Sequence, residues 1–245
     1  MKHHPAMKLP SHPRLKRAPR LAAALWALCL AHSAPAQPSP AAPVPRPGEE
    51  LFSDDFERQD LGEWRAMVPS FTIIDGAMRG QQSPGAHGAV GQVRRPMRDV
   101  VVSFRFKLDG STTFNAVFDD KDFKGSHGGH ICRVLFTTNQ IRLGDDKEGV
   151  MRNDIFEMTK KPGGKALAAP LLAGRGSVAP ARIEQNKWYH ATIEVVGDDM
   201  RVWLDGAPSG HLKSPGIAHE TKSSFHFTVI GPGVLFDDVK ISRPR

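Results

Sequence analysis

Apolar and polar residues alternate with a period of two through most of the chain after residue 50. Apolar side chains occupy every second position in 100–108, 114–118 and 225–229. Such alternation predicts strands with one buried and one solvent-facing side. Because glycine, proline and aspartate interrupt the pattern at short intervals, we expect roughly ten to thirteen short strands, as in an all-β sandwich or jelly roll.

One segment reads as a complete β-hairpin. Tyr189, Ala191 and Ile193 alternate with polar residues, and the chain then turns at Gly197-Asp198-Asp199. A second alternating run follows and ends at Asp205-Gly206. The region 188–205 is therefore expected to form two antiparallel strands. The last strand is expected at 235–241, with Leu235, Asp237, Val239 and Ile241 on one face.

The first 36 residues have the pattern of a secretory signal peptide. Six basic residues and no acid precede an apolar run from Leu21 to Ala31, and small residues end in Ala34-Pro35-Ala36. A basic region, a short apolar region and an A-x-A site are typical of cleavable signals. The apolar run is shorter than the roughly 20 residues of a membrane span. We therefore expect cleavage after Ala36, a secreted or periplasmic location, and no membrane span in the mature chain.

Removing the signal changes the charge of the protein. The full chain has 33 basic and 26 acidic residues. Six of the basic residues lie in the signal, so 27 basic and 26 acidic residues remain. The basic pI of about 9.6 is mostly a targeting feature, and we expect no nucleic-acid partner, which would need a basic face on the folded domain.

Cysteine content excludes an internal disulfide in the exported chain. The sequence has two cysteines, and Cys29 lies in the signal. Cys132 is left alone in the apolar run 131–136, so a buried, unreactive thiol is expected rather than a nucleophile. Stability must then come from burial of a core, for which about 209 residues suffice.

The exported chain divides into a spacer and one domain. Five prolines among the twelve residues 37–48 predict an extended linker over 37–49. A single β-sandwich domain is expected over 50–245. Its regular pattern is broken by an insertion rich in glycine, proline and alanine at about 149–186, and insertions of that length are usually functional or disordered.

Several blocks resemble concanavalin A-like (laminin G/glucanase-type) domains. They are the opening Leu51-Phe52-Ser53-Asp54-Asp55-Phe56, the strand and turn at 73–78, the block from Lys187 to Gly206, and the ending at 235–241. Within that superfamily the chain is most similar to the 3-keto-disaccharide hydrolase-like domains of exported bacterial proteins. The resemblance covers nearly all of 50–243 and implies a two-sheet jelly roll with a concave face that meets carbohydrate. It specifies fold better than activity.

The acidic E-x-D-x-x-E strand of the family-16 glucanases has no counterpart here. The nearest fragment, Asp154-Ile155-Phe156-Glu157, lacks the first acid and lies in the insertion. Hydrolysis by two carboxylates needs such a pair across the scissile bond. Ordinary retaining hydrolysis is therefore disfavoured. A keto-glycoside fits the sequence better as a substrate, because its acidified C–H needs only one base and an oxyanion stabiliser.

The densest polar stretch runs from Asn115 to Lys147, and a solvated loop is the alternative reading for it. His130 is the first candidate for a catalytic base and His127 the second, because histidine titrates near neutrality. Lys147 or Arg142 is the candidate oxyanion partner. Arg133 should point away from His130 unless a bulge intervenes. The candidate substrate-binding residues of the whole chain are Asn115, Asp119, Arg133, Arg142, Asp145, Trp188 and His219.

Two acid pairs lie on the first and last expected strands. Asp54-Asp55 and Asp237-Asp238 would converge if these strands are neighbours, as is common in sandwiches of this type. Adjacent carboxylates repel unless a cation lies between them, and calcium prefers oxygen ligands. A structural calcium ion is thus the one cofactor candidate, with solvated acids as the alternative.

Two classes of function remain open from the sequence. The first is an enzyme that cleaves 3-keto-glycosides or related glycosides by hydrolysis or elimination. The second is a non-catalytic carbohydrate-binding or surface-interaction module. His127, His130, Arg133 and Asp145 gathered in one pocket would favour the enzyme, and their dispersal would favour the module.

Overall fold

The computed structural model describes residues 43–85 and 87–245; the expected signal peptide and most of the linker lie outside this part of the chain. Within it, fifteen strands form two antiparallel sheets. The count exceeds the ten to thirteen expected because several strands at or next to the sheet edges are only four or five residues long. The all-β two-sheet sandwich is confirmed.

The first sheet has eight strands. Seven follow the order β13-β12-β11-β6-β15-β4-β3, and β1 pairs with β15. The expected hairpin is confirmed as β11 and β12. The strands of this sheet are β1 (Pro47–Asp54), β3 (Phe71–Ile74), β4 (Ala77–Gly80), β6 (Val100–Leu108), β11 (Trp188–Val196), β12 (Asp199–Leu204), β13 (Ala207–Lys213) and β15 (Val234–Pro244).

The second sheet has seven strands in the order β10-β9-β8-β7-β14-β5-β2. Its centre joins segments that are far apart in the sequence, because β14 lies between β7 and β5. The strands are β2 (Arg65–Val68), β5 (Ala89–Met97), β7 (Thr113–Asp119), β8 (His130–Thr137), β9 (Gln140–Asp145), β10 (Gly176–Pro180) and β14 (Lys222–Ile230).

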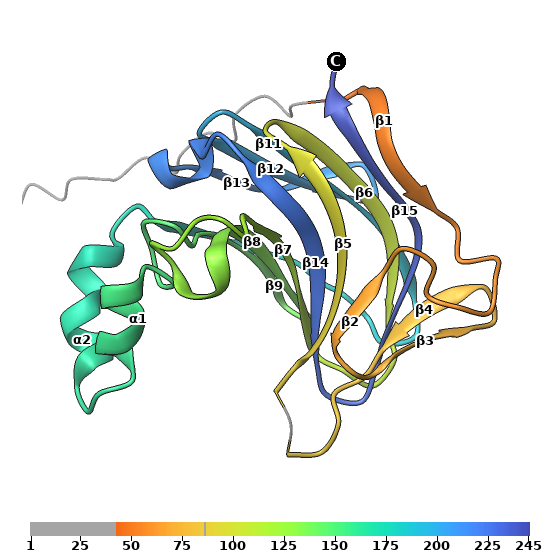
Figure 1. The fold of residues 1–245 in the computed structure, drawn as a ribbon, viewed down its shortest axis with the longest axis horizontal. Coiled ribbons are helices and arrows are strands. Elements are labelled where there is room, and N and C mark those ends of the chain that lie inside the picture. Colours follow the sequence, from red (N-terminus) through yellow and green to blue (C-terminus); the bar gives the residue numbers. More distant parts are fainter. Residues whose placement is uncertain (1–42, 86) are drawn as a thin grey trace, which may run out of the picture. The chain divides into compact units, whose positions relative to one another are not determined.

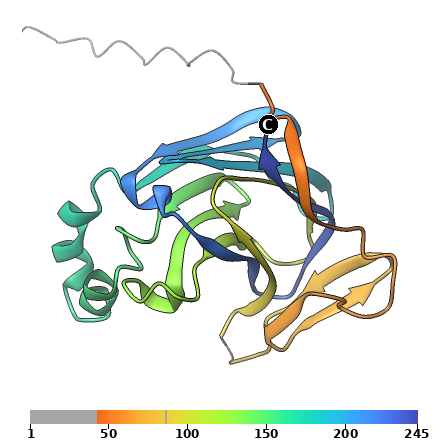
Figure 2. The same cartoon turned by 45° about the horizontal axis from the view of Figure 1, so that its top comes forward.

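The sheets stack face to face around an aromatic core. In Figure 2, strands β11–β13 lie over β7–β9. Phe104 of the first sheet packs edge-to-face on Phe227 of the second, with ring centroids 5.0 Å apart. Phe227 also stacks on Phe236, with centroids 3.9 Å apart. Because the inward position of each strand is aromatic or aliphatic, this burial replaces the missing disulfide as the source of stability.

Both sheets bend, and the outward face of the second sheet lies on the inner side of the bend (Figure 1). The polar positions of β7, β8 and β14 face this side, since Phe118, Cys132 and Phe225 occupy the alternate, core-facing positions. We call this surface the concave face. The period-two pattern thus decides which side chains reach it.

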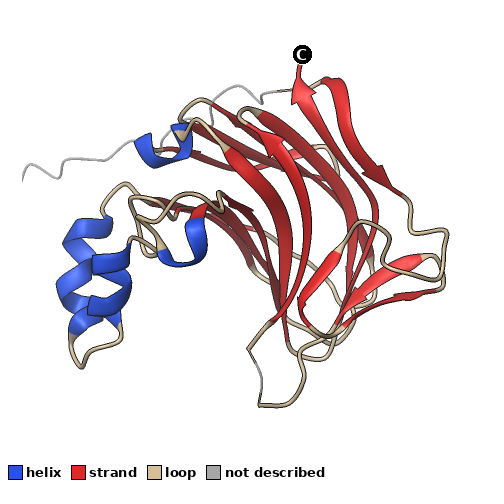
Figure 3. Ribbon diagram, viewed as in Figure 1, coloured by secondary structure: helices blue, strands red, loops and turns tan. Residues whose placement is uncertain are grey.

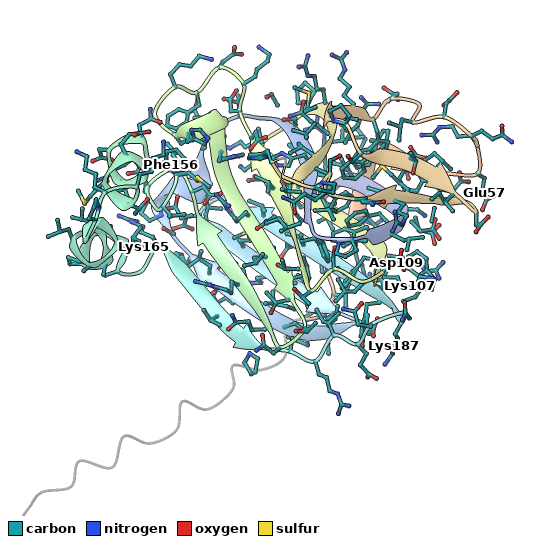
Figure 4. The ribbon with its side chains drawn as sticks, turned by 90° about the horizontal axis from the view of Figure 1, so that it is seen from below. Glu57, Lys107, Asp109, Phe156, Lys165 and Lys187 are labelled. Atoms are coloured by element: carbon teal, nitrogen blue, oxygen red, sulfur yellow. The ribbon has the colours of Figure 1, made fainter. Side chains whose placement is uncertain are left out.

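The helices gather at one end of the sandwich (Figure 3). The insertion forms α1 (Asn153–Thr159), α2 (Gly164–Ala168) and the short helix η2 (Ala169–Leu172). Figure 4 shows Phe156 and Lys165 on this helical pair, at the opposite end from Glu57. Two more short helices, η1 (His127–Gly129) and η3 (Pro215–Ala218), lie in loops. The insertion is not entirely separate from the sandwich, because its strand β10 pairs with β9.

Two boundaries differ from the expectation. Strand β1 begins at Pro47, which pairs with Pro244, so residues 47–49 belong to the sandwich rather than to the linker. In β15 the register shifts between Asp237 and Lys240, and Asp238 has a φ of +49°. This bulge buries Phe236 together with Val239, whereas simple alternation had grouped Leu235 with Val239. No helix among the described residues is long and apolar enough to cross a membrane.

Candidate functional site

Asp119 and His130 face each other across two neighbouring strands on the concave face. They are direct partners of β7 and β8, and Nδ1 of His130 lies 2.6 Å from Oδ1 of Asp119. The register shifts between Phe118 and Asp119, so the stretch of β8 from His130 to Cys132 holds one extra residue. The bulge lets Cys132 enter the core while His130 and Arg133 both face outward. The sequence allowed His130 and Arg133 to share a face only if a bulge intervened, and this bulge is present.

His226 completes a cluster of three. It lies on β14 between Phe225 and Phe227, which point into the core, so its ring faces the same side as Asp119. Its Nδ1 lies 2.8 Å from Oδ2 of Asp119. The contact is close, but its direction does not suit a hydrogen bond, and this buried nitrogen has no hydrogen-bond partner within 43–85 and 87–245.

The carboxylate of Asp119 is ionised in this setting. Burial acts to raise the pKa of Asp119, since its side chain is only 8% exposed. The charge of His226 and the hydrogen bond from His130 outweigh burial and hold the pKa of Asp119 well below its usual range. An ionised, buried carboxylate between two imidazoles fixes their orientation and attracts positive charge.

His127 lies beside this cluster on the η1 loop. Its ring stacks on Phe156 of α1, with centroids 4.0 Å apart, and lies 6.3 Å from the ring of His130. The backbone N–H of His127 donates to the carbonyl of Met151, which ties the loop to the insertion. Burial of the ring and the nearby charges of His130 and Lys160 lower the pKa of His127. Its imidazole is therefore neutral at physiological pH and able to accept a proton.

A cavity of about 450 Å³ adjoins the cluster. Asp119 forms part of its wall, together with Arg94, Lys121 and Gly128. Gly128 has a φ of +65°, and a Cβ added there would lie 3.3 Å from Nε2 of His130. The second nitrogen of His130 is thus turned toward the Gly128 side of this cavity, away from Asp119.

A second cavity, of about 460 Å³, lies farther along the concave face. It collects four predicted substrate-binding residues, namely Asn115, Arg133, Arg142 and Asp145. Asn115 and Asp119 are four residues apart on one face of β7, a separation of about 13 Å. One extended ligand can therefore reach both cavities.

Buried charged side chains lie beneath the second cavity. Arg133 Nε donates to Oδ2 of the fully buried Asp146 over 2.6 Å. Arg133 Nη2 and Asp146 Oδ1 are also buried and have no partner among the described side chains and backbone. Asp145 has a structural role instead, since its carboxylate accepts hydrogen bonds from the Ser214 hydroxyl and the Gly216 N–H.

The insertion supplies the outer wall of this second cavity. Val150, Leu172 and Arg175 line it beside the strand residues. The apolar pair adds contact area, and Arg175 also donates to Ser214 over 3.2 Å. The insertion is therefore part of the site region rather than a separate appendage.

Three predicted site residues lie elsewhere. Trp188 is on β11 of the other sheet, with Arg105 and Lys107 against its ring, so it is remote from the concave face. Lys147 lies over the ring of Phe123, with Nζ 5.4 Å from the centroid, rather than beside His130. His219 packs against the ring of Phe123, and its Nε2 lies 3.0 Å from Oδ2 of Asp120.

Three of the four acids proposed to hold calcium have arginine partners. Asp54 binds Arg58 at 2.5 Å and accepts a hydrogen bond from Trp64 Nε1. Asp237 and Asp238 both contact Arg105, at 3.2 and 3.3 Å. Strands β1 and β15 are neighbours as expected. Calcium binding at these acids stays a prediction. Arginine side chains already place positive charge beside three of them.

His226 is the main residue that sequence reasoning missed. It interrupts an aromatic alternation, Phe225-His226-Phe227, which places it on the outward face. That signal was available, but the neighbour relation between β14 and β7 was not, because about 100 residues separate these strands. Asp146 was missed as a buried partner of Arg133 for the same reason: its burial depends on packing.

Comparison with known proteins supports the fold. No protein-family model and no curated protein matches the chain. A CBM66 carbohydrate-binding module from Bacillus subtilis is 12% identical over 74% of this chain and 95% of its own, with a TM-score of 0.50. The Crh5 transglycosylase is 12% identical over 82% and 89%, with a TM-score of 0.56. SCLam, a non-specific endo-β-1,3(4)-glucanase of family GH16, is 9% identical over 83% and 96%, with a TM-score of 0.53.

These identities are too low to transfer an activity, but the shared arrangement of strands extends over most of each chain. The likeness includes a binding module and enzymes, so fold alone does not choose between the two classes. The two antiparallel sheets, the concave face and these neighbours together establish that the chain has a concanavalin A-like jelly-roll fold.

Proposed function

We propose that the protein is a carbohydrate-active enzyme that cleaves glycosides carrying a keto group two carbons from the anomeric centre, as in 3-keto-glycosides. The observation that carries the proposal is the Asp119–His130 pair at the edge of a cavity on the concave face. A histidine oriented by a buried carboxylate is suited to proton transfer. The resemblance to 3-keto-disaccharide hydrolase-like domains points the same way.

The chemistry needs one base rather than two opposed acids. In a 3-keto-glycoside the C2–H bond is acidified by the adjacent ketone. A neutral imidazole takes that proton, and the C2–H electrons form the enolate. When the enolate collapses, C1=C2 forms, the C1–O bond breaks, and the leaving oxygen receives a proton from the imidazolium. Water adds across C1=C2 in a later step, which completes a net hydrolysis.

Two histidines are candidates for this base. His130 is the first, because Asp119 holds its Nδ1 and leaves Nε2 on the side of Gly128. His127 is the second, because it is neutral and near. The enolate oxygen needs a cationic or N–H donor. Arg94 lines the same cavity and is the first candidate for this role. Lys147 does not line the cavity but contacts Phe123 of its wall, and Arg142 lies in the second cavity.

A non-catalytic carbohydrate-binding module is the alternative. The observation that favours it is the likeness to a CBM66 module over 95% of that chain. The second cavity is also lined by polar side chains suited to sugar hydroxyls, among them Asn115, Arg133 and Arg142, and no histidine is part of its described wall. Binding without turnover would be its signature.

The test is incubation with a p-nitrophenyl 3-keto-glucoside and with the parent p-nitrophenyl glucoside. We expect release of p-nitrophenol from the keto compound only. His130→Ala should lower kcat by about 100- to 10,000-fold, the usual cost of losing a general base. Its thermal midpoint should stay close to that of the wild type, because the ring lies at the surface of the sheet rather than in the core.

His211→Gln is the matched control. His211 forms an exposed pair with Asp199 on β12 and β13, in the other sheet. Its loss should leave turnover unchanged. If the wild-type protein binds glycans but releases no product from the keto compound, the binding-module reading replaces the enzyme.

A further inference from the structure

Asp119, His130 and His226 have the composition and spacing of a metal site. Each offers one ligand atom, and these atoms all lie within 4.8 Å of one another. The set comprises two imidazole nitrogens and one carboxylate oxygen, on three adjacent strands of one sheet. Two histidines and a carboxylate bind zinc and other divalent transition ions in catalytic sites, which keep a further position open.

The distances are compatible with an ion after the side chains adjust. Two ligand atoms that share a tetrahedral zinc ion lie about 3.3 Å apart, since each is about 2.1 Å from the metal. Nδ1 of His130 lies 2.6 Å from Oδ1 of Asp119, whereas Nδ1 of His226 lies 2.8 Å from Oδ2, so the two imidazoles contact different oxygens. The three ligand atoms lie within 4.8 Å of one another. Binding one ion would therefore shift the imidazoles by on the order of an ångström.

A second, independent observation concerns His226. Its side chain is only 4% exposed, and its Nδ1 points at the cluster without a hydrogen-bond partner in the described part of the chain. A buried polar atom without a hydrogen-bond partner destabilises the folded chain. An ion between the three residues would satisfy it directly, and would also neutralise the buried carboxylate.

Two other histidine–aspartate pairs show why this cluster differs. In the first pair, His219 contacts Asp120, and the hydroxyl of Thr221 donates to the same carboxylate. In the second pair, His211 contacts Asp199, and Arg201 forms an ion pair with the same carboxylate. Neither pair has a third ligand of the histidine, cysteine or carboxylate type close by, and no other such group of three occurs in residues 43–85 and 87–245.

We propose that Asp119, His130 and His226 bind a divalent transition ion, with zinc as the first candidate, through the Nδ1 atoms of both histidines. The open position of the ion would face the cavity walled by Asp119 and would take an oxygen of the sugar. When bound, the ion supplies a Lewis acid that polarises this oxygen.

The part of this inference that concerns the reaction rests on the proposed function; the binding of the ion does not. A histidine ligated through Nδ1 carries its proton on Nε2 and is no longer a base. The ion would therefore assign proton transfer to His127, the second candidate, and make His130 a ligand. The enolate oxygen would also have a cation beside it in addition to Arg94 of the cavity wall.

The binding test uses the mature protein dialysed against EDTA and then freed of chelator. Isothermal titration with Zn²⁺ alone should give one ion per chain. His226→Gln and Asp119→Asn should each weaken binding by at least about 100-fold, more than the cost of losing a residue outside the ligand set. His211→Gln should bind zinc as the wild type does. Titration with Co²⁺ should produce visible absorption bands from nitrogen and oxygen ligation.

Nitrogen NMR of the imidazoles tests ion binding at these residues in the wild-type chain. On zinc binding, the Nδ1 signals of His130 and His226 should shift while both Nε2 atoms stay protonated. This measurement also serves if His226→Gln fails to fold. Absence of Zn²⁺ and Co²⁺ binding, or binding that moves no signal of these two residues, would overturn the proposal.

Turnover separates the two proposals. If zinc binds as described but no 3-keto-glucoside is cleaved, the metal site stands and the proposed enzyme falls. If the metal-free protein cleaves the substrate at the full rate, the enzyme stands and the ion has no part in the reaction. If zinc restores activity lost with EDTA, His127→Ala should abolish it, because His127 is then the base.

Discussion

Cys132 is fully buried beside the cluster yet faces the core. Burial raises the pKa of its thiol to about 12. We expect the native protein not to react with a thiol reagent at pH 8, and to react once per chain after unfolding in guanidinium. The folded pKa is raised above the unfolded value of about 8.5. The stability contributed by this thiol is therefore present below about pH 8.5 and is lost as the pH rises toward 12.

Cys132→Ser provides the control for this prediction. It places a hydroxyl in the core, which costs about 1–3 kcal/mol if the hydroxyl has no partner. Turnover should be unaffected. Loss of activity with an unchanged free energy of unfolding would show instead that the thiol has a chemical role.

Asp146 and Arg133 are a second residue-scale case, because one carboxylate is fully buried beneath the second cavity. Asp146→Ala leaves the guanidinium without its partner and should lower the free energy of unfolding by about 3–5 kcal/mol. Glu157→Ala removes an exposed pair with Lys160 and should leave the free energy of unfolding nearly unchanged, because solvent screens this pair. Urea unfolding of the two variants provides the comparison; equal costs would mean that Arg133 is stabilised by solvent.

At the scale of elements, the insertion holds the η1 loop in place. Ser126 and Arg152 form an isolated β-bridge, and Asn153 donates from its backbone to Gly125 and from its side chain to Lys124. Together with the stacking of His127 on Phe156, these contacts make the position of the second candidate base depend on α1. The helical pair, in turn, is short and packs mainly on itself.

Ile155→Ala tests this dependence, since Ile155 is the buried apolar residue of α1. The truncation should cost about 2–5 kcal/mol, the usual range for a core isoleucine, and the cost should appear as local opening. Hydrogen exchange should become faster in 125–130 and 151–172 while β6, β7 and β14 keep their protection. Leu167→Ala, at an exposed position of α2, is the control. Uniform acceleration over all strands would show that the insertion is part of the global folding unit.

The whole molecule carries a prediction about export. The order of basic, apolar and small residues that ends in Ala34-Pro35-Ala36 predicts a mature chain beginning at Gln37. Mass spectrometry of the periplasmic or secreted protein should give the mass of residues 37–245. A retained Met1 or Met7, or a lipid on Cys29, would contradict the prediction. Processing would leave the strands untouched, because β1 begins ten residues later, at Pro47.

Local sequence was sufficient for most of the fold. Period-two alternation identified β6, β7, β14 and the β11–β12 hairpin, because each strand shows one face to the core and one to solvent. It failed where the backbone departs from that period. The bulges in β8 and β15 shift the faces of His130 and Phe236 relative to simple counting. Both departures are backbone events with no strong local signature, apart from adjacent acids in β15.

The sequence by itself determined that the chain from residue 50 onward is a β-sandwich and that Asp119 belongs to its polar face. Only the tertiary structure decided that His130 shares this face and which residues meet the pair. His226 joins the cluster because β14 inserts between β7 and β5, whereas Trp188 is excluded because β11 lies in the opposite sheet. The physical reason is that alternation along a strand depends on neighbouring residues, while strand order depends on the burial of the whole core. A site built across strands is therefore decided by pairing between distant segments.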